Sequence, residues 1–241
     1  MTLTQLQSEI DSLNPQSAPR ARIFSRSENG IGDTPGKLGI LDASFNPPTR
    51  AHEALAADAR KALGLDEVLL MLSRANVDKA ITGASLGQRL EMMLRWADSA
   101  DAMSVGGCSH ARFVDKAFAL RPHYPPETDL TFILGFDTLE RLFDPRYYTD
   151  MKSELSVFFH DCRAAVANRG DQDPEDIHRW LERPETSPFA HCIDVFSVPP
   201  DIAAMSSTEV RNRCADNQPI GHLVPKGVAA YVAEAGLYTA P

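Results

Sequence analysis

Short apolar runs alternate with longer amphipathic segments along most of the chain. The apolar runs have the length of strands and lie at residues 38–41, 67–72, 130–134, 162–168 and 192–198. Between them, recurring apolar residues predict helices at residues 49–63, 86–97 and 138–143. Continuously apolar strands that are joined by helices are typical of a parallel sheet covered on both faces. The pattern therefore predicts an α/β fold.

Helix boundaries in the second half of the chain carry clear signals. Asp173-Pro174-Glu175 supplies a cap, a proline at the first helical position and an early acidic residue. Two closing helices are expected at residues 207–214 and 225–235, and Gly236 is expected to end the second.

The first residues do not follow the alternation. Residues 1–14 resemble a short polar helix, and the stretch up to residue 36 is rich in proline and glycine, with at most a short strand at residues 21–25. We therefore expect an N-terminal extension at residues 1–36 and a single domain at residues 37–241.

Composition narrows the choice of partners. The chain has a formal net charge of -9, which argues against a general nucleic-acid or anionic-membrane surface. Small anionic ligands stay compatible, because a few basic side chains and helix ends suffice to bind them. The four cysteines are widely spaced without a C-x-x-C pair, and the N-terminus lacks the features of a secretory signal. We expect reduced thiols, no membrane span and a cytoplasmic protein, with the nucleus as a second compartment.

The stretch from Ala43 to His52 directly follows the first predicted strand of the domain. Pro47 and Pro48 restrict the backbone and lack N–H groups, and Thr49 is suited to cap the next helix. Free N–H groups at a helix start form a site for an anion, and His52, one turn into the helix, can donate a hydrogen bond to a phosphate oxygen. Taken alone, this is also the pattern of an ordinary capped helix.

A second helix start with similar chemistry lies at residues 205–211. Ser206 or Ser207 can cap this helix, and Arg211 lies four residues after Ser207 on the same face. A hydroxyl and a guanidinium in this arrangement can clamp a terminal phosphate group. An ordinary capped helix with a solvated arginine would contain the same residues, but two such helix starts near opposite ends of an α/β chain together predict a nucleotide site.

These two motifs resemble those of the nicotinamide mononucleotide adenylyltransferases, within the nucleotidylyltransferase superfamily. Residues 43–52 resemble the G-x-x-x-P-x-T/H-x-x-H signature, in the S-F-N-P-x-T form that is typical of eukaryotic members, and residues 205–211 resemble I-S-S-T-x-x-R. Gly135-Phe136-Asp137 is similar to the family's G-x-D segment, and Leu223-Val224-Pro225 is similar to its closing L-V-P helix. The resemblance implies a Rossmann-like, doubly wound parallel sheet in a single domain.

Three departures from the family pattern concern the site. Ala43 replaces the first glycine of the signature, which is tolerable if φ is negative there. Tyr148 or Tyr147 stands where relatives stack a tryptophan on the pyridine ring, and residues 102–116 hold no clear second stacking tryptophan. Trp96 and Trp180 are expected to lie outside the site.

The resemblance implies transfer of AMP from ATP to nicotinamide mononucleotide, giving NAD and pyrophosphate. The implied catalytic residues are His52, Lys79 and Arg211. The implied ATP-binding residues are Ser44, Phe45, Thr49, His52, Ser206, Ser207, Thr208 and Arg211. The implied nicotinamide-nucleotide residues are Ser44, Asn46, Gly135, Asp137, Tyr148 and Arg169. Mg²⁺ is expected on the ATP phosphates rather than in a site made by protein side chains.

Two other functions stay open from the sequence. One is adenylyl or cytidylyl transfer to another phosphorylated acceptor, such as a phosphopantetheine-like or phosphocholine-like molecule. The other is a catalytically impaired nucleotide-binding protein that serves as a chaperone. In each case we expect small-molecule nucleotides as ligands, no nucleic acid and no membrane, and a homo-oligomer is left open.

Overall fold

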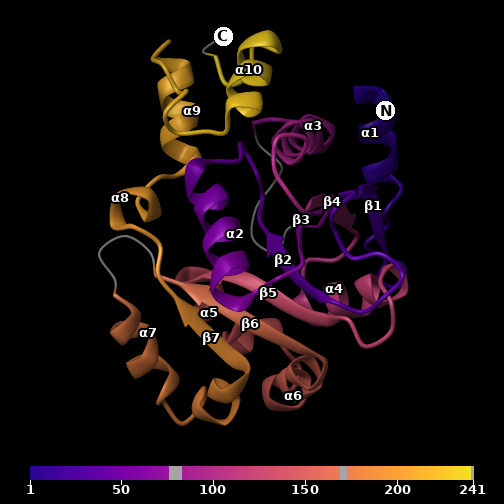
Figure 1. Cartoon of the computed structure of the whole chain (residues 1–241), viewed down its shortest axis with the longest axis vertical. Helices are drawn as coiled ribbons and strands as arrows, with labels where there is room; N and C mark the ends of the chain where they lie inside the picture. Colours follow the sequence, from indigo (N-terminus) through magenta and orange to yellow (C-terminus); the bar gives the residue numbers. More distant parts are fainter. Residues whose placement is uncertain (76–82, 169–172, 240–241) are drawn as a thin grey trace.

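A seven-stranded sheet organises the computed structural model, which describes residues 1–75, 83–168 and 173–239 (Figure 1). The strand order in this described part is β1-β4-β3-β2-β5-β6-β7. All neighbouring strands are parallel except β1, which pairs antiparallel with β4. The predicted α/β fold with a doubly wound, mostly parallel sheet is confirmed.

The elements have the following bounds. The strands are β1 Ala21–Ser25, β2 Lys37–Asp42, β3 Glu67–Ser73, β4 Met103–Cys108, β5 Asp129–Gly135, β6 Cys162–Ala167 and β7 Ile193–Phe196. The helices are α1 Leu3–Asp11, α2 Arg50–Leu63, α3 Leu86–Ala97, α4 Phe113–Leu120, α5 Phe136–Leu142, α6 Met151–Asp161, α7 Pro174–Leu181, α8 Pro200–Ala203, α9 Ser207–Ala215 and α10 Lys226–Glu234. Three short 3₁₀ turns, η1 Arg121–His123, η2 Pro145–Tyr147 and η3 Ser187–Cys192, complete the described elements.

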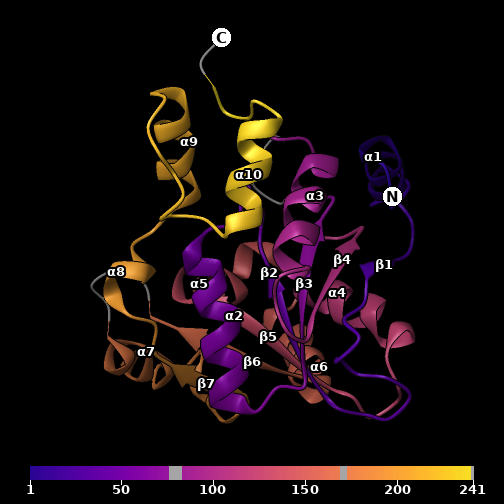
Figure 2. The ribbon, with the colours of Figure 1, turned by 45° about the horizontal axis from the view of Figure 1, so that its top comes forward.

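Helices cover both faces of the sheet, which explains why the strands are apolar throughout. Along β2, Leu41 points into one hydrophobic core, and Leu38 and Ile40 point into the other. The first core contains residues of α1, α2, α3 and α10, and the second contains residues of α4, α5, α6 and α7. Figure 2 shows α1, α3 and α10 side by side over the first core.

The strand order predicts a crevice at the carboxyl ends of the strands. From β2 the chain continues to β3 and β4 on one side, and then crosses to β5 on the other side of β2. In an open α/β sheet, the helices on either side of such a reversal leave a crevice at the carboxyl ends of the strands. The loops that follow β2 and β5 therefore face this crevice.

Residues 1–36, which we expected to form an N-terminal extension, pack against the rest of the fold. The predicted strand at residues 21–25 is present as β1 and pairs with β4, while Leu6 and Ile10 of α1 are fully buried. Strand β4 escaped prediction because its Gly106 and Gly107 give it little apolar character. A Cβ on Gly107 would lie 2.6 Å from Ile10 Cδ1, so the glycine permits α1 to approach the sheet closely. Helices α4 and α6 also escaped prediction.

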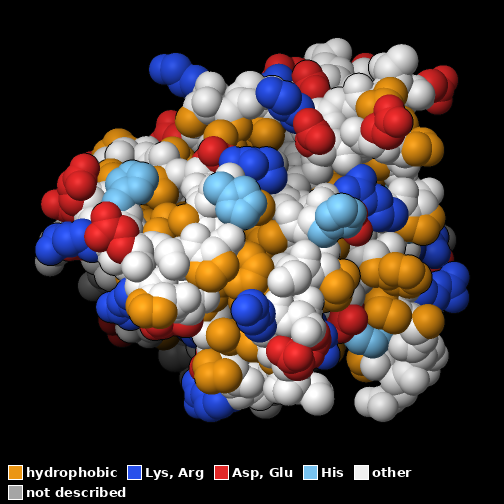
Figure 3. All heavy atoms as spheres, turned by 90° about the horizontal axis from the view of Figure 1, so that it is seen from below, with side chains coloured by type: hydrophobic (Ala, Val, Ile, Leu, Met, Phe, Trp, Pro, Cys, Tyr) orange, Lys and Arg blue, Asp and Glu red, His pale blue; other side chains and the backbone are white. Residues whose placement is uncertain are grey.

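Charge and cysteine usage add two observations. On the face shown in Figure 3, basic and acidic side chains are interspersed rather than grouped by sign. All four cysteines are buried and free, and burial raises the pKa of the Cys162 thiol to about 12. Among the described helices, none combines the length and the apolar character that a membrane crossing needs.

Candidate active site

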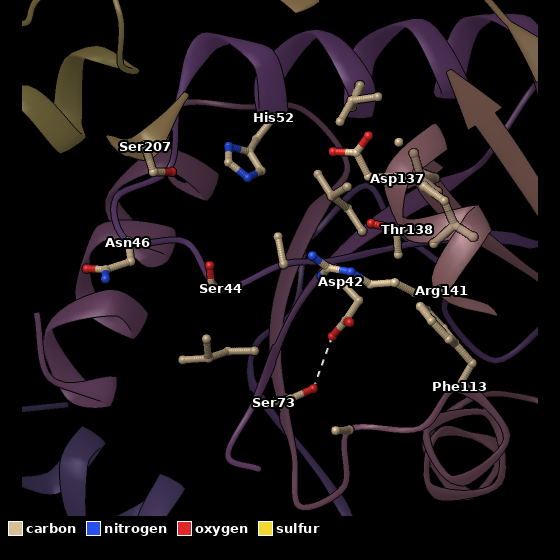
Figure 4. Close-up of a pocket in the computed structure, with 18 of the residues that line it drawn as sticks. Asp42, Ser44, Asn46, His52, Ser73, Phe113, Asp137, Thr138, Arg141 and Ser207 are labelled. Atoms are coloured by element: carbon tan, nitrogen blue, oxygen red, sulfur yellow. Dashed lines mark hydrogen bonds between the residues drawn. The ribbon is translucent and has the colours of Figure 1, made fainter. Parts of the chain in front are cut away.

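A cavity of about 590 Å³ opens at the carboxyl ends of β2 and β5, where the strand order reverses. Its wall is formed by the turn after β2, the first residues of α2, the start of α5, the loop before α4 and the start of α9 (Figure 4). The volume is typical of a pocket for a small organic ligand. The two predicted motifs, separated by more than half of the chain, meet in this cavity.

Helix α2 begins as predicted and directs His52 into the cavity. Thr49 is its N-cap, and the Thr49 N–H donates to His52 Nδ1 at 3.0 Å, with Thr49 Oγ1 at 2.8 Å from the same nitrogen. Because Nδ1 accepts a hydrogen bond, the neutral ring carries its proton on Nε2. The ring also contacts Phe45, with the two ring centroids 5.2 Å apart. His52 is thereby oriented as a hydrogen-bond donor.

Two residues of the first motif support the site without lining it. The side chains of Phe45 and Thr49 are fully buried, and each contacts His52. Phe45 has a φ of 43°, which is rare for a bulky residue and bends the chain sharply before the prolines. Ala43 is not among the residues with positive φ, so alanine replaces the expected glycine without backbone strain.

Helix α9 supplies the opposite wall. Ser206 is the cap, since its hydroxyl accepts from the Glu209 N–H at 3.2 Å, and Ser207 and Thr208 form the first turn. Ser207, Thr208 and Arg211 line the cavity together with His52. Figure 4 shows Ser207 and His52 on facing elements of the wall.

The turn after β2 is tied to α9 by two hydrogen bonds. Ser207 Oγ donates to the Pro47 carbonyl at 2.8 Å, and Arg211 Nη1 donates to the Asn46 carbonyl at 2.7 Å. Arg211 Nη2 also donates to Thr208 Oγ1 at 3.0 Å. These bonds hold a guanidinium beside two hydroxyls and a helix N-terminus, an arrangement that attracts anionic oxygens.

The Asn46 side chain is held by residues from two further parts of the chain. Its Oδ1 accepts from the Tyr238 hydroxyl at 2.9 Å and from the Ala84 N–H at 3.2 Å. Burial raises the pKa of Tyr238, which keeps its hydroxyl protonated as a donor. Arg89, itself buried, donates through Nη1 to the Ser44 carbonyl at 3.3 Å. Burial lowers the pKa of Arg89, which is the expected effect of removing a cation from water.

The cavity continues from His52 toward α5. Gly135 is the N-cap of this helix, and Asp137, Thr138 and Arg141 line the cavity (Figure 4). Tyr148 lines the same part, and its hydroxyl donates to the Leu142 carbonyl at 2.5 Å. Burial raises the pKa of Tyr148 to about 12.

Several cavity residues were not predicted. Asp42, at the end of β2, forms an ion pair with Lys116 of α4, with 2.5 Å between Oδ2 and Nζ, and its Oδ1 accepts from the Ser73 hydroxyl at 3.1 Å. Phe113, at the start of α4, lines the cavity close to this pair, and Lys116 Nζ lies 4.8 Å from the centroid of its ring. The one signal in the sequence was an aspartate at the end of an apolar strand, directly before the first motif.

Most of the predicted residues meet in the cavity. Those that line it are Ser44, Asn46, His52, Gly135, Asp137, Tyr148, Ser206, Ser207, Thr208 and Arg211. Lys79 and Arg169 lie outside the residues that the structure describes. As predicted, Trp96 and Trp180 are buried elsewhere, the former against Phe45 and the latter against Phe136 and Phe143.

The two ends of the cavity differ in chemistry. One end presents the starts of α2 and α9 with an imidazole, two hydroxyls and a guanidinium, and the other presents aromatic rings together with carboxylates and the cations Arg112 and Arg141. A polyphosphate complements the first end, and a flat ring with polar substituents complements the second. A Rossmann-like sheet with two anion-attracting helix starts at its reversal point is the arrangement expected of a nucleotidyltransferase.

Comparison with known families supports this class. Residues 40–213 match the family described as cytidylyltransferase-like. The chain belongs to this family, and it is a nucleotidyltransferase.

Individual relatives carry related names. A Schizosaccharomyces pombe protein provisionally named nicotinamide mononucleotide adenylyltransferase is 35% identical over 160 residues, which cover 64% of this chain and 61% of that protein. A Dehalococcoides mccartyi protein provisionally named nicotinate-nucleotide adenylyltransferase is 30% identical over 218 residues, covering 84% of this chain and 97% of the relative. The structure of Plasmodium falciparum nicotinic acid mononucleotide adenylyltransferase complexed with NaAD has a TM-score of 0.62 at 16% identity, covering 84% of this chain and 97% of that one. The structural match shows that the fold is shared.

Proposed function

We propose that the protein transfers AMP from ATP to nicotinamide mononucleotide, giving NAD and pyrophosphate. The observation that carries this proposal is the meeting of His52 with Ser207 and Arg211, from two helix starts, in one cavity. Relatives in two groups of organisms are named for adenylyl transfer to a pyridine mononucleotide, which agrees with the proposal.

The donor half of the reaction uses the starts of α2 and α9. The β- and γ-phosphates of ATP lie against Ser207, Thr208 and Arg211, and His52 Nε2 donates to an oxygen of the α-phosphate. As the pentacovalent arrangement develops at the α-phosphorus, charge on its oxygens increases, so an oriented donor stabilises the transition state more than the ground state. Because the Thr49 N–H donates to Nδ1, the proton of the neutral ring is on Nε2, and Nε2 is therefore the donor.

The bond changes require no catalytic base. An oxygen of the acceptor's 5′-phosphate forms the new bond to the α-phosphorus, and the bond from that phosphorus to the bridging oxygen of pyrophosphate breaks. The nucleophile is already anionic, so the protein contributes alignment and charge stabilisation. The products are the dinucleotide and pyrophosphate.

The geometry of in-line displacement also indicates where the acceptor mononucleotide binds. The nucleophile approaches the α-phosphorus from the side opposite pyrophosphate, which puts the acceptor on the side of His52 away from Arg211, toward α5 and α4. Tyr148 and Phe113 line that part of the cavity and offer faces for a pyridinium ring, a cation that aromatic faces attract. Asp137, in the first turn of α5, is suited to accept hydrogen bonds from the ribose hydroxyls.

Nicotinamide and nicotinate mononucleotide differ by one negative charge, and we propose the nicotinamide form as the preferred acceptor. The S-F-N-P-x-T form of the first motif and the name of the Schizosaccharomyces pombe relative support this choice. The names of the bacterial and Plasmodium relatives favour nicotinate, so both acceptors belong in the test.

Mg²⁺ completes the proposal as a partner of ATP. The side chains at the phosphate end are hydroxyls, an imidazole and a guanidinium, which complement phosphate oxygens. Mg²⁺ would therefore be carried by the phosphates and water, and it would supply charge neutralisation of the triphosphate.

The test is a coupled assay of the purified protein. ATP and Mg²⁺ are combined with nicotinamide mononucleotide or nicotinate mononucleotide, and both pyrophosphate and dinucleotide are measured. We expect equal amounts of the two products, with the nicotinamide form used more efficiently. Absence of dinucleotide with both acceptors would overturn the proposal, and parallel reactions with CTP and with phosphopantetheine or phosphocholine would then identify a different nucleotidyl transfer.

A further inference from the structure

The buried ion pair between Asp42 and Lys116 lies in the cavity wall, but its two charges are not equally accessible. The Lys116 side chain is 2% exposed, whereas the Asp42 side chain is 15% exposed. Both residues line the cavity, and a bound ligand has more access to the carboxylate oxygens than to the balancing ammonium. The pairing offsets part of the cost of burying the carboxylate.

The Asp42 carboxylate is also fixed in direction. Lys116 Nζ holds Oδ2 at 2.5 Å, and the Ser73 hydroxyl donates to Oδ1 at 3.1 Å. These two bonds come from different elements, α4 and the end of β3. Each carboxylate oxygen has a further lone pair, so Asp42 can accept another hydrogen bond from the cavity.

This carboxylate lies in the acceptor half of the cavity. Figure 4 shows Asp42 near Ser73 and on the same side of the cavity as Phe113, while Ser207 and Asn46 are on the other side of His52. Phe113 also contacts Lys116, which places the ion pair next to an aromatic face that lines the cavity. A pyridinium ring on this face would present its substituent in the neighbourhood of Asp42.

We propose that Asp42, oriented by Lys116 and Ser73, is a specificity determinant that favours an acceptor with a carboxamide over one with a carboxylate. This inference rests on the proposed function, because it concerns the choice between two pyridine mononucleotides. The N–H groups of a carboxamide donate to Asp42, whereas a carboxylate offers no proton and meets a like charge. A carboxylate that is held in a fixed direction discriminates strongly between the two substrates, since the wrong substrate leaves it without a hydrogen-bond donor.

Arg141 provides the competing explanation. Its guanidinium points into the same half of the cavity, and a cation there would favour a carboxylate. Arg112 also lines this cavity, but its charge is balanced by ion pairs with Asp115 and Glu154. Arg141 is exposed to solvent, so its charge is screened, whereas the Asp42 carboxylate is largely shielded. The proposal therefore gives Asp42 the larger effect on acceptor choice.

The experiment compares kcat/KM for nicotinamide mononucleotide with kcat/KM for nicotinate mononucleotide in several full-length variants. Asp42→Asn combined with Lys116→Met removes both charges and avoids an unpaired buried ammonium. The matched control is Asp101→Asn combined with Arg60→Met, which removes an ion pair at the surface away from the cavity. Ser73→Ala keeps the ion pair and removes one of the two bonds that orient Asp42, and Arg141→Gln tests the alternative.

We expect the ratio of the two kcat/KM values to fall about tenfold in the Asp42 and Lys116 variant, which corresponds to one hydrogen bond to a charged group. The KM for ATP should stay unchanged, and the control should keep the wild-type ratio. Ser73→Ala should lower the ratio by a smaller factor, and this variant decides the matter if the double variant does not fold. An unchanged ratio, or a change found in Arg141→Gln alone, would overturn the role of Asp42.

The outcomes separate this inference from the proposed function. If the wild-type protein uses neither acceptor, the proposed function fails. If it uses both and the variants keep the same ratio, only the inference fails. If the wild-type protein prefers nicotinate and the Asp42 variant widens that preference tenfold, the role of Asp42 stands and the nicotinamide assignment is wrong.

Discussion

Replacing His52 separates the two functions of its ring nitrogens. Nδ1 accepts from the Thr49 N–H at 3.0 Å and supports the start of α2, whereas Nε2 is the donor that we propose for the α-phosphate. His52→Ala removes both functions. We expect kcat to fall by on the order of 10²-fold or more, about 3 kcal/mol, which is typical for loss of one transition-state donor.

The same substitution has a predictable effect on stability. The Thr49 N–H loses its acceptor, and Phe45 loses the ring that lies 5.2 Å away. Loss of one hydrogen bond of this kind lowers the free energy of unfolding by about 1 kcal/mol. This value is small compared with the stability of a typical domain, so the variant should remain folded during the kinetic assay.

Two isosteric variants distinguish these effects. The amide of His52→Asn reaches the position of Nδ1 and can accept from Thr49, so this variant should recover stability but not activity. The amide nitrogen of His52→Gln reaches the position of Nε2, so this variant should recover part of kcat. Stability is measured by urea unfolding, and kcat is measured at saturating ATP and acceptor. The reasoning is refuted if His52→Ala keeps the wild-type kcat, or if His52→Asn is more active than His52→Gln.

Three further predictions follow from the geometry of the site. Arg211→Ala should raise the KM for ATP by about tenfold while changing the acceptor KM much less, because charge-assisted hydrogen bonds to the terminal phosphates are lost. Equal increases in KM for both substrates in steady-state kinetics would contradict the assignment of Arg211 to the ATP phosphates. Tyr238→Phe removes the 2.9 Å hydrogen bond to Asn46, and it should lower both the free energy of unfolding, by about 1 kcal/mol in urea unfolding, and the affinity for nucleotide. Wild-type stability and affinity would show that this bond is dispensable. Burial raises the pKa of Tyr148 from 10.0 to about 12, so its contribution to stability is complete below pH 10 and is lost as the pH rises toward 12. Alkaline unfolding of Tyr148→Phe should lack this loss, and an identical pH profile in the two proteins would argue against the buried environment of Tyr148.

The parts of the site that were predictable are encoded locally. Caps and prolines specify a helix start within a few residues, so the starts of α2 and α9 could be located from residues 43–52 and 205–211 alone. Their meeting in one cavity follows from the α/β order, because loops after parallel strands share one edge of the sheet. The choice of Ser206 over Ser207 as the cap needed the structure, since either hydroxyl suits that role.

The parts that escaped prediction depend on contacts between distant residues. Asp42 and Lys116 are 74 positions apart, and neither residue type signals a partner. Phe113 belongs to α4, a short helix next to a glycine-containing strand that was itself not predicted. In β4, glycine is needed because α1 packs closely there, a reason that lies in the tertiary structure. Local propensity gives little information about such positions.

The hydrogen bonds that hold the turn after β2 can form only late in the synthesis of the chain. Asn46 emerges from the ribosome early, but it is held by Arg211 and Tyr238, which are translated 165 and 192 residues later. A growing chain can form the β2 to β6 part of the sheet before these ties exist, yet its turn then lacks the contacts that shape the nucleotide site. We therefore expect nucleotides to bind most tightly to chains that have been completed beyond the last helix, and to stabilise those chains selectively.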